Sequence, residues 1–305
     1  MRVRIATRKS ELALWQAGHA ADALRRLPEI SSVELVPLTT RGDRILDRDL
    51  SKVGGKGLFI KELEVAMEDG DADIAVHSMK DVPAEMPAGF CIAALLERAD
   101  PFDALVSTRA RGIAHLAAGA VVGSSSLRRH AQLKALRPDV EVRPLRGNVN
   151  TRLGKLDDGE FDAILLACAG LERLGLSDRI RERISPDHML PASAQGVIGI
   201  ECLEKRRDLR SLLLRLNHGP TELTTTAERA VARFLGASCH SPLASYAVAE
   251  GDRLTLTALV ASVDGKTVLR ERVTGGTRDA EVLGARAGQR LLERGAAGLL
   301  HEGQE

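Results

Sequence analysis

The stretch 121–153 constrains the fold of this 305-residue chain more than any other, because it repeats one local pattern. A short apolar strand runs into the polar turn 123–126 and then into a helix. A second strand, 140–144, runs through the turn 146–148 into another helix. Units of strand, turn and helix pack side by side into α/β sheets, with the helices on the sheet faces. The pattern therefore predicts an α/β fold.

Basic side chains stand at or near the start of both helices of this stretch: Arg128, Arg129, Arg146 and Arg152. The first turn of a helix normally favours acidic residues, so this charge is unusual. Backbone N–H groups at a helix start bind anions, and the planar guanidinium fork suits the oxygen pair of a carboxylate or phosphate. A single arginine in such a place is usually solvated surface. Two units with the same charge predict an anion site.

Composition limits what else the chain can bind. It has 43 basic and 42 acidic residues, a net charge of +1, so no overall field would draw it to nucleic acid or to an acidic membrane. Aromatic residues make up 2% of the chain and leave few platforms for stacking bases. The sequence shows neither a signal-peptide apolar run near its start nor a run long enough to cross a bilayer. We expect a cytoplasmic protein that binds neither nucleic acid nor membrane.

The four cysteines, Cys91, Cys168, Cys202 and Cys239, are far apart and form no CxxC pair. The spacing predicts neither a zinc site nor a disulfide framework, so we expect free thiols and no metal. Three of them are interpreted as small buried apolar residues. Cys239 differs, because it lies in a short loop between a capped helix and a run of strands.

Two more strands bring polar residues to their carboxyl ends, where open α/β sheets bind ligands. The first strand of the chain is followed by Arg8 and Ser10, and the strand 73–77 is followed by Lys80 and Asp81. Ser10 could equally serve only as a helix N-cap. An aspartate in such a place is also often just a turn residue, so both interpretations stay open at this point.

The rest of the chain completes two lobes and adds a third domain. Segment 67–78 is similar to 156–167 in its helix end, Gly-acid turn and strand, as two related lobes would be. The charged, glycine-rich loop 41–57 is expected to be a mobile lid. The lobes should be joined by two hinge crossovers. We assign the domains as a first α/β lobe, 1–98 with 197–216; a second α/β lobe, 99–196; and a small α+β domain with an antiparallel sheet, 217–305.

Eight separated motifs, in order, give nearly the whole chain a family resemblance. They are IATRKSELALWQA, KVGGKGLFIKELE, HSMKDVP, GSSSLRR, RGNVNTRL, LACAGLERLG, LPASAQG and GASCHSP. Together they resemble the hydroxymethylbilane synthase family, also called the porphobilinogen deaminases. The departures are conservative: Ser124 stands where threonine is common, and Leu243-Ala244 stands where Ile-Gly is common.

The resemblance implies an enzyme with two lobes similar to periplasmic binding proteins and a third domain. Such an enzyme joins four porphobilinogen molecules head to tail, releases four ammonia molecules, and then releases linear hydroxymethylbilane. It implies one covalent dipyrromethane cofactor per chain, held by a thioether to Cys239. It also implies a monomer whose small-molecule partner is porphobilinogen, within tetrapyrrole and heme biosynthesis.

The resemblance also assigns site residues. Asp81 matches the catalytic carboxylate, which either donates a proton to the leaving amine or stabilises the cation that ammonia leaves behind; the sequence leans toward stabilisation. The cofactor-binding positions are Cys239, Asp81, Lys80, Ser126, Arg128, Arg129 and Arg146. The substrate-binding positions are Arg8, Ser10, Lys56, Arg152, Arg173 and Gln195.

A second function fits the same fold. Two such lobes could also form a non-enzymatic solute-binding or sensor protein, since fold alone does not fix function. Cys239 and the third domain would have no role in that case. Intact mass separates the two hypotheses, because only the enzyme carries a covalent cofactor.

Overall fold

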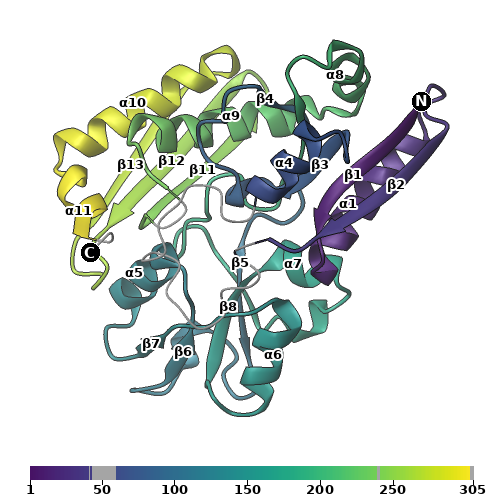
Figure 1. The fold of residues 1–305 in the computed structure, drawn as a ribbon. Coiled ribbons are helices and arrows are strands. Elements are labelled where there is room, and N and C mark those ends of the chain that lie inside the picture. Colours follow the sequence, from purple (N-terminus) through teal and green to yellow (C-terminus); the bar gives the residue numbers. More distant parts are fainter. Residues whose placement is uncertain (41, 43–59, 239–240, 303–305) are drawn as a thin grey trace. The chain divides into compact units, whose positions relative to one another are not determined.

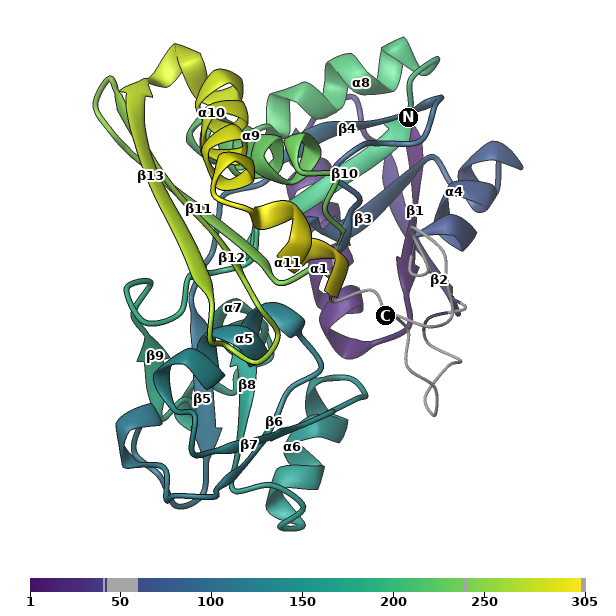
Figure 2. The same cartoon turned by 90° about the vertical axis from the view of Figure 1, so that its left-hand side faces the viewer.

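The computed structural model describes residues 1–40, 42, 60–238 and 241–302. These residues group into two compact units, 1–99 with 197–222 and 100–196 with 223–305. Three sheets run through them: two of mixed strand direction and one that is antiparallel (Figures 1 and 2). The predicted fold class of two α/β lobes with a smaller α+β part is thereby confirmed. The boundaries assigned to the three domains stay a prediction.

The sheet of the first unit has five strands, in the spatial order β2 (Ser32–Leu38), β1 (Arg2–Arg8), β3 (Ile74–Ser78), β10 (Ile198–Leu203) and β4 (Phe90–Leu95). β1 runs parallel to β2 and β3. β10 runs antiparallel to both of its neighbours, β3 and β4. The carboxyl ends of β1 and β3 therefore meet at one edge of this sheet.

Helices cover both faces of this sheet, because successive strand residues point to opposite sides. Ile5 packs in the apolar cluster of α1 (Glu11–Arg25), which Figure 1 shows in purple beside β1 and β2. The next residue, Ala6, packs with Ala75 in the cluster of α4 (Lys61–Glu68). The face of β3 that carries Ala75 is thus the α4 face.

The sheet of the second unit has the same design, in the order β7 (Glu141–Arg143), β6 (Val121–Gly123), β8 (Ala163–Ala167), β5 (Asp103–Ser107) and β9 (Glu182–Ile184). The first three strands are parallel, and β5 runs antiparallel to both of its neighbours. Its helices are α5 (Leu127–Leu136), α6 (Val149–Asp157) and α7 (Cys168–Arg173). β8 holds the place that β3 holds in the first sheet, which explains the sequence similarity of 67–78 and 156–167.

The third sheet is antiparallel throughout, with strands β11 (Leu243–Glu250), β12 (Arg253–Ala261) and β13 (Val268–Gly276). It packs one face against α9 (Gly219–Phe234), α10 (Ala280–Glu293) and α11 (Ala296–Glu302). Figure 2 shows α10 and α11 lying along this sheet. None of the described helices is long and apolar enough to cross a membrane.

The two hairpin turns of the third sheet have opposite surroundings. Gly265, in the β12–β13 turn, has a φ of +75°, and a Cβ built on it would lie 2.5 Å from the backbone nitrogen of Ala135 in α5. Gly251, in the β11–β12 turn, has a φ of +57°, and a Cβ there would meet no atom within 4 Å. The first turn rests directly on the α5 backbone, and the second is open.

Candidate active site

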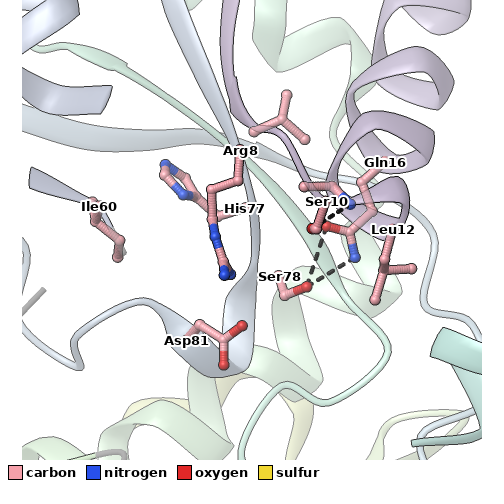
Figure 3. Close-up of a pocket in the computed structure, with 10 residues that line it drawn as sticks. Arg8, Ser10, Leu12, Gln16, Ile60, His77, Ser78 and Asp81 are labelled. Atoms are coloured by element: carbon pink, nitrogen blue, oxygen red, sulfur yellow. Dashed lines mark hydrogen bonds between the residues drawn. The ribbon is translucent and has the colours of Figure 1, made fainter. Parts of the chain in front are cut away.

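The structure brings the predicted residues of the first lobe together in one pocket. Arg8 ends β1, Ser10 caps α1, and Asp81 ends the short helix η1 (Met79–Asp81) that follows β3. They line this pocket with Gln16, His77 and Ser78 (Figure 3). The meeting follows from the parallel pairing of β1 with β3, which places both strand ends at the same edge of the sheet.

Two side chains of this pocket are hydrogen-bonded to each other, whereas the Asp81 carboxylate has no partner among the described residues. Ser78 and Gln16 bind each other, with Gln16 Nε2 donating to Ser78 Oγ at 2.8 Å. Arg8 and Asp81 point toward one another in Figure 3. The Asp81 side chain is exposed and makes no hydrogen bond or ion pair with any described residue. Its carboxylate is therefore available to a ligand, and Arg8 adds a positive charge beside it.

The turn that carries Asp81 is held by a buried residue. Met79 is 1% exposed, and its backbone N–H donates to the carbonyl of Val197 at 3.0 Å. A Cβ built on Gly199 would lie 2.1 Å from the Met79 sulfur, so only glycine leaves room for that side chain. Lys80 lies in the same turn, half-buried. Asp81 is thus an exposed side chain on an anchored backbone.

Four buried polar side chains of the second unit form one cluster. Asp103, the first residue of β5, accepts a hydrogen bond from Arg128 Nη1 at 2.6 Å and one from Arg129 Nη2 at 2.7 Å. Gln195 Nε2 donates to the same carboxylate at 3.0 Å. Arg128 and Arg129 are only 4% and 6% exposed, and Asp103 is fully buried. The two adjacent arginines were predicted to face an anion, and the structure turns both toward an internal aspartate.

The charges of this cluster do not balance. Burial alone would raise the pKa of the Asp103 carboxyl, but Arg128 and Arg129 outweigh that effect and hold the pKa well below its usual range. Burial lowers the pKa of Arg129, which Asp103 partly offsets. Two guanidinium groups share one carboxylate, so the cluster keeps a net positive charge in the protein interior. That charge suits ligands rich in carboxylates.

The remaining predicted residues of the second lobe are distributed around α5, α6 and α7. Ser126 caps α5, its Oγ accepting from the N–H of Arg129 at 3.4 Å. Arg146 and Arg152 are half-buried, and Arg152 Nε donates to the carbonyl of Gly147 at 2.8 Å. Arg173 donates to the carbonyl of Gly196 at 2.7 Å, and burial lowers its pKa to about 10.

One residue that sequence reasoning missed holds the segment that carries Gln195. Glu228, fully buried on α9, accepts from the N–H of Ala194 at 2.6 Å and from the N–H of Ala247 at 2.9 Å. Ala194 has a φ of +58°, a left-handed conformation that is unfavourable for alanine. The Glu228 carboxylate thus ties a strained turn to β11. Asp103 was missed as well, although a lone aspartate opening an apolar strand was a signal.

Some predicted features lie outside the described residues. They are Cys239, Lys56 and nearly all of the loop 41–57 that was expected to be a lid. The described parts that flank Cys239 are α9, which ends at Phe234, and β11, which begins at Leu243.

Comparison with known proteins extends over nearly the whole chain. Residues 3–211 match the family model described as porphobilinogen deaminase, dipyromethane cofactor binding domain, and residues 222–293 match porphobilinogen deaminase, C-terminal domain. A porphobilinogen deaminase of Bordetella parapertussis is 55% identical over 99% of this chain and 96% of its own length. One from Chromobacterium violaceum is 52% identical over 98% of this chain and 97% of its own.

Solved structures are similar at a much lower level. The VFT2 domain of Bordetella pertussis BvgS is 14% identical, with a TM-score of 0.44, over 70% of this chain and 86% of that one. A putative methionine-binding lipoprotein of Bacillus subtilis is 11% identical, with a TM-score of 0.45, over 72% of this chain and 90% of that one. Likeness at this level says nothing of what the chain binds.

Proposed function

This chain belongs to the porphobilinogen deaminase family, and we propose that it performs the family's reaction with Asp81 at the reacting centre. It is a transferase of tetrapyrrole biosynthesis that joins four porphobilinogen molecules head to tail, with loss of four ammonia molecules, and releases linear hydroxymethylbilane by hydrolysis. The observation that supports the place of the chemistry is the pocket where Asp81 lies with Arg8 and Ser10.

Asp81 has the exposure and the setting that the reaction needs. Loss of ammonia leaves the pyrrole with cationic character, and a carboxylate near the ring N–H stabilises that charge. The Asp81 carboxylate has no partner among the described residues, so it can accept from the ring without breaking an internal bond. Arg8, which points toward it, would hold a carboxylate of the substrate in the same pocket.

The arginines of the second unit would bind the acid groups of the growing chain, since each pyrrole carries two carboxylates. Arg146, Arg152 and Arg173 are half-buried, which gives a guanidinium both partial desolvation and access to a ligand. Arg128 and Arg129 are more deeply buried and would act through the net positive charge that they keep after pairing with Asp103.

The residues present fit a dipyrromethane cofactor, because this buried positive cluster has the charge that its carboxylates require. When bound, the cofactor supplies the pyrrole carbon to which the first substrate is joined. We propose Cys239 as its attachment point. In the sequence the residue lies between α9 and β11, and the thioether would form by attack of its sulfur on an electrophilic pyrrole carbon.

Intact mass tests this proposal. The purified protein should exceed the 32.8 kDa chain by two linked pyrrole units, and Cys239→Ser should remove that excess together with activity. Cys91→Ser is the matched control, because Cys91 is a half-buried free thiol and its variant should keep the adduct. An adduct that survives in Cys239→Ser would reject the attachment point, and a wild-type protein of bare mass after expression in a cell that makes porphobilinogen would reject the function.

We further propose that the chain works as a monomer in the cytoplasm, on porphobilinogen and without nucleic acid. Its net charge of +1 and its 2% aromatic content support the last point. Cys91, Cys168 and Cys202 are free thiols, as proteins of a reducing compartment usually have. Sedimentation velocity should show one species at the mass of a single chain, and a dimer peak at working concentrations would contradict the monomer.

A further inference from the structure

A buried histidine and a buried glutamate form a pair beside the proposed reaction pocket. His77 Nε2 and Glu201 Oε2 are 2.7 Å apart, and the two side chains are 5% and 0% exposed. His77 lines the pocket that contains Asp81, and Ser78, Met79 and Lys80 lie between the two residues in the chain. The chemistry assigned above to Asp81 and the arginines makes no use of this pair.

The sheet register places the pair. His77 lies opposite Gly199 on the neighbouring strand β10, and Glu201 lies opposite Ala75. Residues two apart on a strand share a face, so His77 and Glu201 are diagonal neighbours on the face that α4 covers. A carboxylate and an imidazole are thus brought together by backbone pairing in the middle of a five-stranded sheet.

The hydrogen bond fixes what His77 can do. When Glu201 is ionised it only accepts, so Nε2 carries the proton of this hydrogen bond and Nδ1 is the nitrogen left to accept one. Nδ1 binds no described residue, and His77 is one of the residues that line the pocket. A base oriented by a buried carboxylate is the arrangement that stabilises an imidazolium once it forms.

Other charged groups act on the same pair. Burial and the nearby charge of Glu201 raise the pKa of Glu64 on α4 to about 7. His77 partly offsets this rise. Of the neighbours on α4 itself, Glu68 raises the pKa of Glu64 and Lys61 lowers it. Glu201 Oε1 is buried and has no partner among the described residues. From the pocket side, Arg8 and Asp81 face the same space. A buried carboxylate oxygen without a hydrogen-bond partner lowers the stability of the fold, so the presence of Glu201 here needs another explanation.

We infer that His77, oriented by Glu201, is the base that takes up the proton released when each new carbon–carbon bond forms, while Asp81 stays ionised to stabilise the cation. The inference rests on the proposed function and names the proton acceptor for it. The carbon–nitrogen bond of the substrate's protonated amine breaks with its electron pair going to nitrogen, and ammonia leaves. The ring carbon that forms the new bond then loses its proton to His77 Nδ1. The imidazolium returns that proton to the departing ammonia or to solvent, which restores neutral His77.

The test compares His77→Gln and Glu201→Gln in the holoenzyme, after intact mass has shown the adduct to be present. Removing a positioned base should lower turnover at neutral pH by at least ~10²-fold. In the wild type turnover should fall at acid pH as the base becomes protonated. That acid limb should vanish in His77→Gln and move to lower pH in Glu201→Gln, where the imidazolium has lost its carboxylate. His19→Gln, an exposed histidine of the same unit, should leave the profile unchanged.

A second measurement does not depend on turnover. Ring-nitrogen NMR of the wild type, with the His77 signals identified by their loss in His77→Gln, should show Nε2 protonated throughout and Nδ1 titrating. If the pair only supports the fold, both variants lose melting temperature and keep the wild-type acid limb, which would overturn the inference. So would an Nδ1 that stays protonated across the active pH range. Loss of the adduct in the wild type would instead reject the proposed function.

Discussion

Replacing Asp103 with alanine is expected to destabilise the protein by about 3 to 5 kcal/mol, because it leaves two buried guanidinium groups without their carboxylate. Arg128 and Arg129 each bind Asp103, and Gln195 binds the same carboxylate, so three side chains lose their common partner. Urea unfolding followed by far-UV circular dichroism measures the loss. Asp139→Ala is the matched control, since Asp139 pairs with Arg137 at the surface and little change is expected there.

The pH dependence of stability gives a second readout at the same site. Arg128 and Arg129 hold the pKa of Asp103 below its usual range against the effect of burial, whereas an unfolded aspartate takes up a proton near pH ~3.9. Between those two values the unfolded state binds more protons than the folded state. The stabilisation is therefore present above the unfolded pKa and is lost as pH falls through the folded one. Asp103→Asn should flatten this acid limb, and an unchanged limb would contradict the pairing.

Replacing Asp81 with alanine should lower turnover by roughly 10²- to 10⁴-fold, the range typical of one positioned charged group in a reaction. The side chain is exposed and binds no described residue, so the melting temperature should change little. Asp81→Asn keeps the size and removes the charge, and it should be nearly as damaging if the carboxylate stabilises a cation. Glu85→Ala, an exposed carboxylate of the same segment, is the control. Near-normal turnover in both Asp81 variants would remove Asp81 from the reaction.

The local elements could be predicted from the sequence because their signals are local. The apolar strands, the polar turns and the cap at Ser10 all depend on neighbours within a few residues. The place of Asp81 could also be anticipated, since it needs only the rule that ligands bind at the carboxyl ends of parallel strands. In the structure, Arg8, Ser10 and Asp81 line one pocket.

The buried charge pairs could not be predicted, because they depend on partners far apart in the chain. Asp103 meets Arg128 only after β5 takes its antiparallel place beside β8, and His77 meets Glu201 across 124 residues. The arginines were predicted as an anion-binding set, but the internal carboxylate between two of them was missed. Glu228 was missed for the same reason, since its partners Ala194 and Ala247 are backbone N–H groups that no motif marks.

The contrast between the two hairpin turns of the third sheet decides where this protein can be extended. Hairpin tips are usually the places where a chain accepts an inserted peptide. At Gly265 even one added carbon would meet the α5 backbone, so an insertion there would push on the helix whose first turn carries Arg128 and Arg129. At Gly251 the surrounding space is open. An affinity tag or a fluorescent reporter therefore belongs in the β11–β12 turn, and natural length variation in this sheet should be confined to the same turn.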